Sequence, residues 1–256
     1  MDKNDQLRTL QKSWAECRSC PLSEERNNVV FGAGSQNAQI LIIGESPGEN
    51  EDRYGLPFIG LAGQILHQFL GDVSSRQDVI QAYLEITSKR QSEAAIAQAK
   101  GRLLDLLLME FYFTNVVLCR PSENRDPLPK EVAACRPRLL EQIYLIDPIF
   151  IVAAGRIATE ALLGKKISIT QSRGELMDLT FEGRGIFFRY PVLPVLHPSY
   201  IMRRNDYSQP GGEAEKTRND FLRVARLVDE FNLNHYGIQR PNLRPKFINT
   251  DKKRKQ

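Results

Sequence analysis

Four apolar runs recur along the chain and alternate with amphipathic stretches. The runs are rich in Ile, Val, Leu and Phe and cover residues 39–43, 111–117, 149–153 and 187–196. Short runs of this composition are typical of buried strands. Apolar residues at helical spacing predict helices over residues 4–16, 61–70, 130–146, 155–164 and 217–231. Because strands and helices alternate, the sequence predicts a parallel sheet with helices on both faces, an α/β fold.

A long connection separates the first two predicted strands. It spans residues 64–113, and residues 74–100 within it are mostly helix formers with weak amphipathicity. Because so long a connection normally has structure of its own, we expect one or two extra helices packed on the outside of the fold. With this connection included, residues 1–239 are expected to form a single domain.

Positive charge is concentrated at the C-terminus. Residues 240–256 contain seven basic residues and one acidic residue, whereas residues 1–239 contain 28 basic and 30 acidic residues. The segment 240–256 is therefore a basic tail on a weakly acidic domain. Two interpretations of the tail remain: a solvated chain end, or an arm that binds a polyanion such as nucleic acid.

Composition and hydropathy are those of a soluble globular protein, with 41% hydrophobic and 26% charged residues. No apolar run approaches the roughly 18–20 residues that a membrane helix needs. The N-terminal residues lack the apolar core of a signal peptide. We therefore expect a cytoplasmic protein that does not associate with membranes.

Four cysteines form a candidate metal site. Cys17 and Cys20 make a C-x-x-C pair, whereas Cys119 and Cys135 lie far along the chain with fifteen residues between them. In a cytoplasmic chain, four thiols with one close pair indicate metal ligands rather than disulfides. Zinc and iron–sulfur clusters both use four thiolates, and the wide second spacing favours iron–sulfur. The alternative is four unrelated buried thiols.

Three of the predicted strands end in groups that can act on a substrate. Glu45 follows the first strand, Asn115 lies at the end of the second, and His197 follows the last. Since the carboxyl ends of parallel strands meet at one sheet edge, we expect these side chains to share a cleft. Together with Phe58, they predict a pocket that stacks a planar ring, hydrogen-bonds its edge and stabilises developing charge. Taken singly, each has a structural interpretation, as has His67 in the middle of a predicted helix.

Several motifs in a fixed order resemble one enzyme family. They are GESPG at 44–48, ED at 51–52, GLPFIG at 55–60, TNVV at 114–117, CRP at 119–121, NRDP at 124–127, Glu131 with CRP at 135–137, and HPSY at 197–200. This set resembles the family 4 uracil-DNA glycosylases, the iron–sulfur branch of the uracil-DNA glycosylase superfamily. The resemblance covers residues 17 to about 204, apart from the long connection, and includes all four cysteines.

The resemblance implies a fold and a cofactor. The fold is a three-layer α/β/α arrangement around a central four-stranded parallel sheet. The cofactor is a structural [4Fe–4S] cluster held by Cys17, Cys20, Cys119 and Cys135. Such a cluster would tie the N-terminal segment to the loop after the second strand. Because glycosidic cleavage consumes only water, no dissociable cofactor is implied.

The activity that the resemblance implies is hydrolysis of the N-glycosidic bond of deoxyuridine in DNA, as in base excision repair, after the base is rotated out of the helix. Phe58 would stack on the uracil, and Asn115 would bond to its O4 and N3–H edge, which cytosine mismatches. His197 would donate to O2 as negative charge grows there. Glu45 would orient the water or face the cationic sugar. DNA is the implied partner, and we expect a monomer.

The first motif also suggests residues around the base. Gly44 and Ser46 are expected to line the base pocket. Thymine differs from uracil by one methyl group, so a side chain of segment 49–54 should pack against C5 of the base. Tyr54 is the candidate for this exclusion.

The histidine motif is followed by a candidate DNA contact. Met202 or Ile201 is expected to wedge into the vacated base stack while Arg203 and Arg204 hold phosphates. The alternative is a buried loop followed by solvated arginines.

Departures from the family pattern leave two other functions open. Ser46 and Leu118 stand where alanine and lysine are commoner, and the long connection and basic tail are additions. One alternative is a glycosylase for a modified pyrimidine in foreign DNA, and the other is a DNA-binding module without turnover. Retention of the polar groups at the strand ends favours an enzyme.

Overall fold

The computed structural model describes residues 2–74, 76–87, 92–204 and 210–236, so the predicted basic tail lies outside the described residues. The helices are α1 (Lys3–Trp14), α2 (Glu49–Tyr54), α3 (Leu61–Val73), α4 (Gln77–Thr87), α5 (Glu93–Glu110), α6 (Pro129–Ile146), α7 (Arg156–Leu163), α8 (Ile169–Ser172), α9 (Pro198–Arg204) and α10 (Glu213–Tyr236). The strands are β1 (Ala33–Gly34), β2 (Ile40–Gly44), β3 (Tyr112–Asn115), β4 (Phe150–Ala154), β5 (Met177–Gly183) and β6 (Ile186–Val195). Two short 3₁₀ turns lie at Pro21–Ser23 and Ser122–Asn124.

The strands form one sheet in the order β1-β3-β2-β4-β6-β5. The four inner strands are mutually parallel, which confirms the parallel sheet predicted from the alternating elements and the four-stranded core that the resemblance implies. The two outer strands, β1 and β5, are antiparallel to their neighbours and extend the sheet beyond the prediction. In β5 only Leu179 is fully buried, so this edge strand lacks the apolar run by which a strand is recognised.

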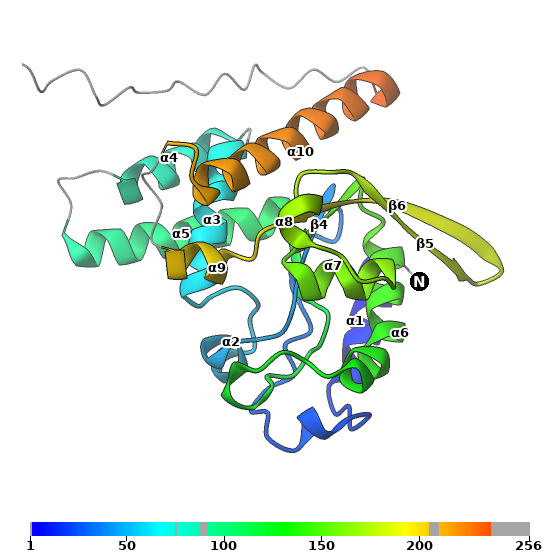
Figure 1. Ribbon diagram of the computed structural model, residues 1–256. Coiled ribbons are helices and arrows are strands. Elements are labelled where there is room, and N and C mark those ends of the chain that lie inside the picture. The colour runs from blue at the N-terminus through cyan, green and yellow to red at the C-terminus, as the bar shows by residue number, and fades with distance from the viewer. Residues whose placement is uncertain (1, 75, 88–91, 205–209, 237–256) are drawn as a thin grey trace, which may run out of the picture.

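Helices cover both faces of the sheet, as predicted, because alternate strand residues point to opposite sides (Figure 1). Ile40 and Ile42 of β2 pack with residues of α3, α4, α5, α9 and α10 in one apolar cluster. Leu41 and Ile43 pack in a second cluster with residues of α6 and α7, and α1 lies against its outside. The three layers place the carboxyl ends of the inner strands between the two helical layers.

The connection between β2 and β3 is helical, but the prediction that its helices pack on the outside is wrong for α5. Leu103 and Leu107 of α5 are at most 2% exposed and belong to the same cluster as Ile42 and Phe113. Each such side chain stabilises the fold by about 1.5–3 kcal/mol when buried. Apolar residues lie around much of α5 rather than on one stripe, so its sequence does not show which face is buried.

No helix among the described residues combines the length and the apolar character needed to cross a bilayer.

Candidate active site

The carboxyl ends of β2, β3, β4 and β6 lie at one edge of the sheet. Gly44 is paired in register with Asn115, and Ala154 is paired with Val195. Glu45 and His197 therefore continue from neighbouring parts of the same edge. The structure brings these three predicted side chains to the place where open α/β sheets hold their ligands.

Gly44 is the point at which the predicted base-binding side chains converge. A Cβ atom on Gly44 would lie 2.4 Å from Oδ1 of Asn115 and 2.6 Å from Cζ of Phe58. Both distances are far below contact, so only glycine allows the amide and the phenyl ring to approach the strand end together. Asn115 is 3% exposed and Phe58 is 7% exposed. The amide and the ring are therefore both buried beside the end of β2.

Two buried carboxylates, Glu51 and Asp52, hold the segment that carries Phe58. Glu51 accepts hydrogen bonds from the backbone N–H groups of Gly48 at 3.1 Å and Gly60 at 2.6 Å. It thereby joins the two ends of the segment 48–60, and Phe58, a residue with φ of 57°, lies two positions before Gly60. Asp52, which is 1% exposed, accepts from the backbone N–H groups of Asn27 and Asn28. The sequence shows these carboxylates in the motif but not their partners.

His197 is poised as a neutral donor. The N–H of Ser199 donates to Nδ1 of His197 at 3.2 Å, which places the ring proton on Nε2. Ser199 Oγ lies 2.7 Å from the same Nδ1 atom. Burial of the ring, together with the charge of Arg203, lowers the pKa of His197 to about 4. At neutral pH the ring is therefore uncharged and its Nε2–H is available to an acceptor.

Glu45 has an unusually basic carboxylate. Burial, reinforced by the negative charge of Asp126 and opposed by Arg156, raises the pKa of Glu45 to about 7. Asp126 and Arg156 themselves form an ion pair of 2.9 Å. A carboxylate poised near neutrality in a cleft is a candidate for handling a water molecule or a developing cation.

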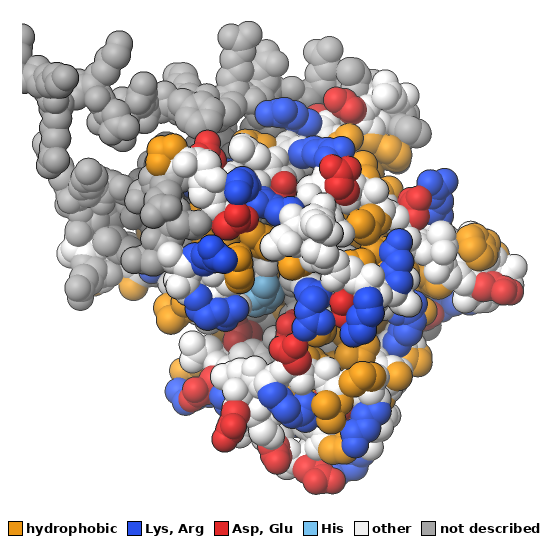
Figure 2. Space-filling model, in the orientation of Figure 1, with side chains coloured by type: hydrophobic (Ala, Val, Ile, Leu, Met, Phe, Trp, Pro, Cys, Tyr) orange, Lys and Arg blue, Asp and Glu red, His pale blue; other side chains and the backbone are white. Residues whose placement is uncertain are grey.

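Exposed cations lie around the strand ends. Figure 2 shows Lys and Arg side chains gathered around a hollow on this face, with a histidine side chain at its floor. Arg203 and Arg204 at the end of α9 are exposed, and the guanidinium of Arg204 lies 5.1 Å from the centre of the Tyr200 ring. Such exposed cations are suited to phosphate contacts.

Two of the remaining candidates are not where the sequence predicts them. Ile201 is 0% exposed and part of the apolar core, so the prediction that it wedges into the base stack is wrong. Met202, its alternative, is half-buried on α9. Tyr54 is 65% exposed at the end of α2, so the structure does not bring its ring to the base pocket. Ser46 is half-buried directly beyond Glu45.

The four cysteines come from three separated segments but interact with one another. Cys119 and Cys135 are buried, whereas Cys17 and Cys20 are half-buried. Burial raises the pKa of Cys119 to about 11; Arg26, which donates to its Sγ at 3.3 Å, opposes the rise, and Cys135 and Cys20 add to it. Burial also raises the pKa of Cys20, with Cys135 and Cys17 contributing. Within the described part of the chain, no three His, Cys, Asp or Glu side chains stand at metal-binding spacing.

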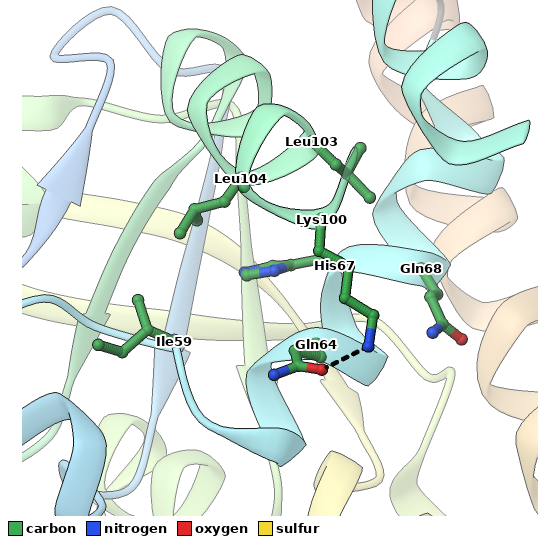
Figure 3. Close-up of a pocket in the computed structure, with 8 residues that line it drawn as sticks. Ile59, Gln64, His67, Gln68, Lys100, Leu103 and Leu104 are labelled. Carbon is green, nitrogen blue, oxygen red and sulfur yellow. Dashed lines mark hydrogen bonds between the residues drawn. The ribbon is translucent and has the colours of Figure 1, made fainter. Parts of the chain in front are cut away.

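His67 belongs to a different part of the molecule. It lines a cavity of about 190 Å³ between α3 and α5, together with Gln64, Gln68 and Lys100 (Figure 3). Its ring is 5% exposed, meets Phe113 edge-on at 6.1 Å, and has an Nε2 atom without a partner among the described residues. Burial lowers the pKa of His67 to about 4. The ring is therefore buried and lies away from the strand ends that carry Asn115 and His197.

Known proteins are similar to this chain over most of its length. The family model described as the uracil DNA glycosylase superfamily matches residues 31–223. A type-4 uracil-DNA glycosylase of Thermotoga maritima is 36% identical over 73% of this chain and 79% of its own length. One of Sulfurisphaera tokodaii is 33% identical over 76% of this chain and 75% of its length. One of Archaeoglobus fulgidus is 27% identical over 87% of this chain and 94% of its length.

Proposed function

The chain belongs to the uracil-DNA glycosylase superfamily, and from this premise we propose that it hydrolyses the N-glycosidic bond of deoxyuridine in DNA. The observation that carries the proposal is the convergence of Asn115 and Phe58 on Gly44, beside a neutral His197 at the same sheet edge. These groups supply what a flipped uracil requires: a stacking surface, an edge with a donor and an acceptor, and a donor for the departing anion.

Base recognition rests on Asn115 and Phe58. The ring of Phe58 stacks on the uracil, and the side-chain amide of Asn115 donates to O4 and accepts from N3–H. Cytosine presents an amino group and an unprotonated N3 at these positions, so it would face donor against donor and acceptor against acceptor. Because Asn115 is 3% exposed, an unmatched pair there has no water to compensate it, and discrimination is strong.

Bond cleavage leaves negative charge on uracil and positive charge on the sugar. The Nε2–H of His197 donates to O2, where the charge of the leaving base accumulates, and a preorganised donor of this kind contributes about 2.7–4 kcal/mol in other enzymes. Because His197 is neutral before the reaction, it acts by donating a hydrogen bond rather than by adding a full charge. Glu45, when ionised, faces the cationic sugar and orients the attacking water.

The donor set of the four cysteines fits an iron–sulfur cluster. Cys17, Cys20, Cys119 and Cys135 supply four soft ligands, and two of them are already buried. We propose that they would hold a [4Fe–4S] cluster, whose contribution would be structural, since it would tie the segment after α1 to α6 and to the loop after β3. Replacing Cys135 with alanine is expected to remove the brown colour and lower the thermal midpoint.

The cellular setting follows from the same activity. We propose a monomeric protein that acts on DNA in the cytoplasm, with Arg203 and Arg204 holding phosphates and Met202 beside the vacated stack.

Incubation with an end-labelled oligonucleotide containing one deoxyuridine tests the proposal. Alkali treatment followed by a denaturing gel is expected to show a strand break at the uracil, in single-stranded or double-stranded substrate. Matched oligonucleotides with thymine or cytosine at that position are expected to stay intact. Absence of a break in every uracil substrate, from protein with its full iron content, would refute the assignment; cleavage only at a modified pyrimidine would redirect it.

A further inference from the structure

Arg138 is a fully buried cation at the junction of the cysteine site and the base-binding strand. It lies on α6, one turn after Cys135, and is 0% exposed. One face of the helix therefore presents both the proposed cluster ligand Cys135 and the guanidinium.

The guanidinium fixes the carboxyl end of β3. Its Nη2 atom donates to the backbone oxygen of Asn115 at 2.8 Å and to that of Val116 at 2.9 Å. Its Nη1 atom donates to Oγ1 of Thr114 at 3.1 Å and to Oε1 of Gln142 at 2.8 Å. Three consecutive residues of the strand end, with Asn115 in the middle, are thus held by a single side chain.

None of these partners carries a negative charge. No carboxylate forms an ion pair with Arg138 among the described residues. A buried guanidinium without a counter-ion costs several kcal/mol, and hydrogen bonds to neutral oxygens offset only part of that cost. In addition, its Nε–H group is buried without an acceptor in the described structure.

The four cysteines are the place where a negative charge could balance Arg138. The ionisable groups that interact with Arg138 are Cys135, Tyr112 and Cys119, and the side chain of Cys135 is within hydrogen-bonding reach of it. Two of the three are proposed cluster ligands. A cluster held by four thiolates carries net negative charge and has sulfur atoms that accept hydrogen bonds. Such a group fits both the unbalanced charge and the unpartnered Nε–H.

We propose that Arg138 is the buried counter-cation of the iron–sulfur cluster and, through the same guanidinium, the positioning residue for Asn115. The proposal rests on the cluster assigned under the proposed function. It makes the cluster more than a tie between segments: its charge keeps Arg138 in place, and Arg138 keeps the base-reading strand end in place. Arg138 contacts no substrate atom.

Three variants separate the two roles. Arg138→Met removes the charge at similar volume, and Arg138→Lys keeps the charge but loses the fork that reaches two backbone oxygens. Arg136→Met is the matched control, because Arg136 also follows Cys135 on α6 yet donates to the backbone oxygen of Ala161. The measurements are iron content, the rate of bleaching by a chelator, the cluster reduction potential, and kcat and KM per iron-loaded protein.

For Arg138→Met we expect bleaching at least about tenfold faster than wild type, the equivalent of one charge-assisted hydrogen bond. Its reduction potential should shift to more negative values, because a nearby cation favours the more negative reduced cluster. Arg138→Lys should keep the wild-type potential and lifetime but lose about tenfold in kcat per iron, with KM little changed. Arg136→Met should match wild type in all four measurements.

A wild-type potential and bleaching rate in Arg138→Met would overturn the charge role. If that variant does not fold, Arg138→Lys decides: an altered potential or lifetime overturns the charge role, and an unchanged kcat overturns the positioning role. Wild-type protein that binds iron but leaves uracil in DNA would instead refute the proposed function. The potential and bleaching measurements would still test Arg138, since neither requires turnover.

Discussion

Replacing Glu45 with glutamine is expected to stabilise the protein at alkaline pH while removing most of its uracil excision. The structure raises the pKa of Glu45 from 4.5 to about 7, so the folded protein holds this proton more tightly than the unfolded chain does. The resulting stabilisation is fully present below pH 4.5 and is lost as the pH rises through 7. At pH 8 the ionised carboxylate therefore destabilises the fold, whereas glutamine there remains neutral.

The size of the effect on stability follows from the rise in the pKa of Glu45 from 4.5 to about 7. This rise in pKa corresponds to a free-energy difference of about 3 kcal/mol between the two proteins at pH 8. Because Glu45 is partly exposed, screening by water reduces the expected difference to about 1–2 kcal/mol. Near pH 5, where the folded carboxyl is protonated, glutamine and glutamate should differ by a few tenths of a kcal/mol. Excision at pH 8 should fall by about 10²-fold, a usual loss for a positioned acid–base group.

Denaturant unfolding of the iron-loaded wild type and Glu45→Gln at pH 5 and pH 8 measures the first effect. Single-turnover release of uracil over the same pH range measures the second, and the wild-type rate should rise with pH through about 7. Equal stability of the two proteins at pH 8 would show that burial does not destabilise the ionised carboxylate of Glu45. A flat wild-type pH profile would remove Glu45 from the chemistry.

Three other predictions concern the same site and its surroundings. Asp126→Asn removes a negative charge that raises the pKa of Glu45, so the rising limb of the pH–rate profile should move to lower pH; an unmoved limb contradicts the assignment of that limb. Gly44→Ala should lower kcat at least about tenfold because its Cβ has no room. Gly101→Ala, whose Cβ would meet nothing within 4 Å, should leave kcat unchanged and raise the free energy of unfolding by up to about 1 kcal/mol. His67→Leu removes a buried nitrogen that has no partner in the described part of the chain, and it should raise the unfolding free energy by about 1 kcal/mol at pH 7. Because the pKa of folded His67 is about 4 and the unfolded value is about 6.5, wild-type stability should fall between pH 6.5 and 4, and His67→Leu should flatten that fall in denaturant titrations.

The sheet and the edge that carries the site were predictable because apolar runs and their ends are local features. The run that ends at Gly44 predicts both a buried strand and the place where Glu45 emerges. Asn115 and His197 follow from the same rule applied to two other strands. The edge strand β5 was missed because most of its side chains are exposed or half-buried and polar residues interrupt it.

What the sequence could not show are contacts between distant residues. In the sequence, Glu51 looks like any other carboxylate of the motif. Its role in holding the segment around Phe58 depends on the N–H group of Gly60, nine positions away. Ile201 has the apolar character of a wedge, but α9 packs against α3 and buries it. Arg138 is missed for the same reason, since an arginine on a helix is normally solvated, and only the structure shows that β3 covers it.

The most direct test of the central claim is the single-turnover rate of uracil release by wild type and by Asn115→Ala, at equal iron content. The wild type is predicted to release uracil and to leave cytosine in an otherwise identical oligonucleotide. Asn115→Ala is predicted to keep its cluster colour and to release uracil at least about 10²-fold more slowly, because the amide at the strand end is the group that reads the base. An Asn115→Ala protein that releases uracil at the wild-type rate would contradict the claim that the base is recognised at this edge of the sheet.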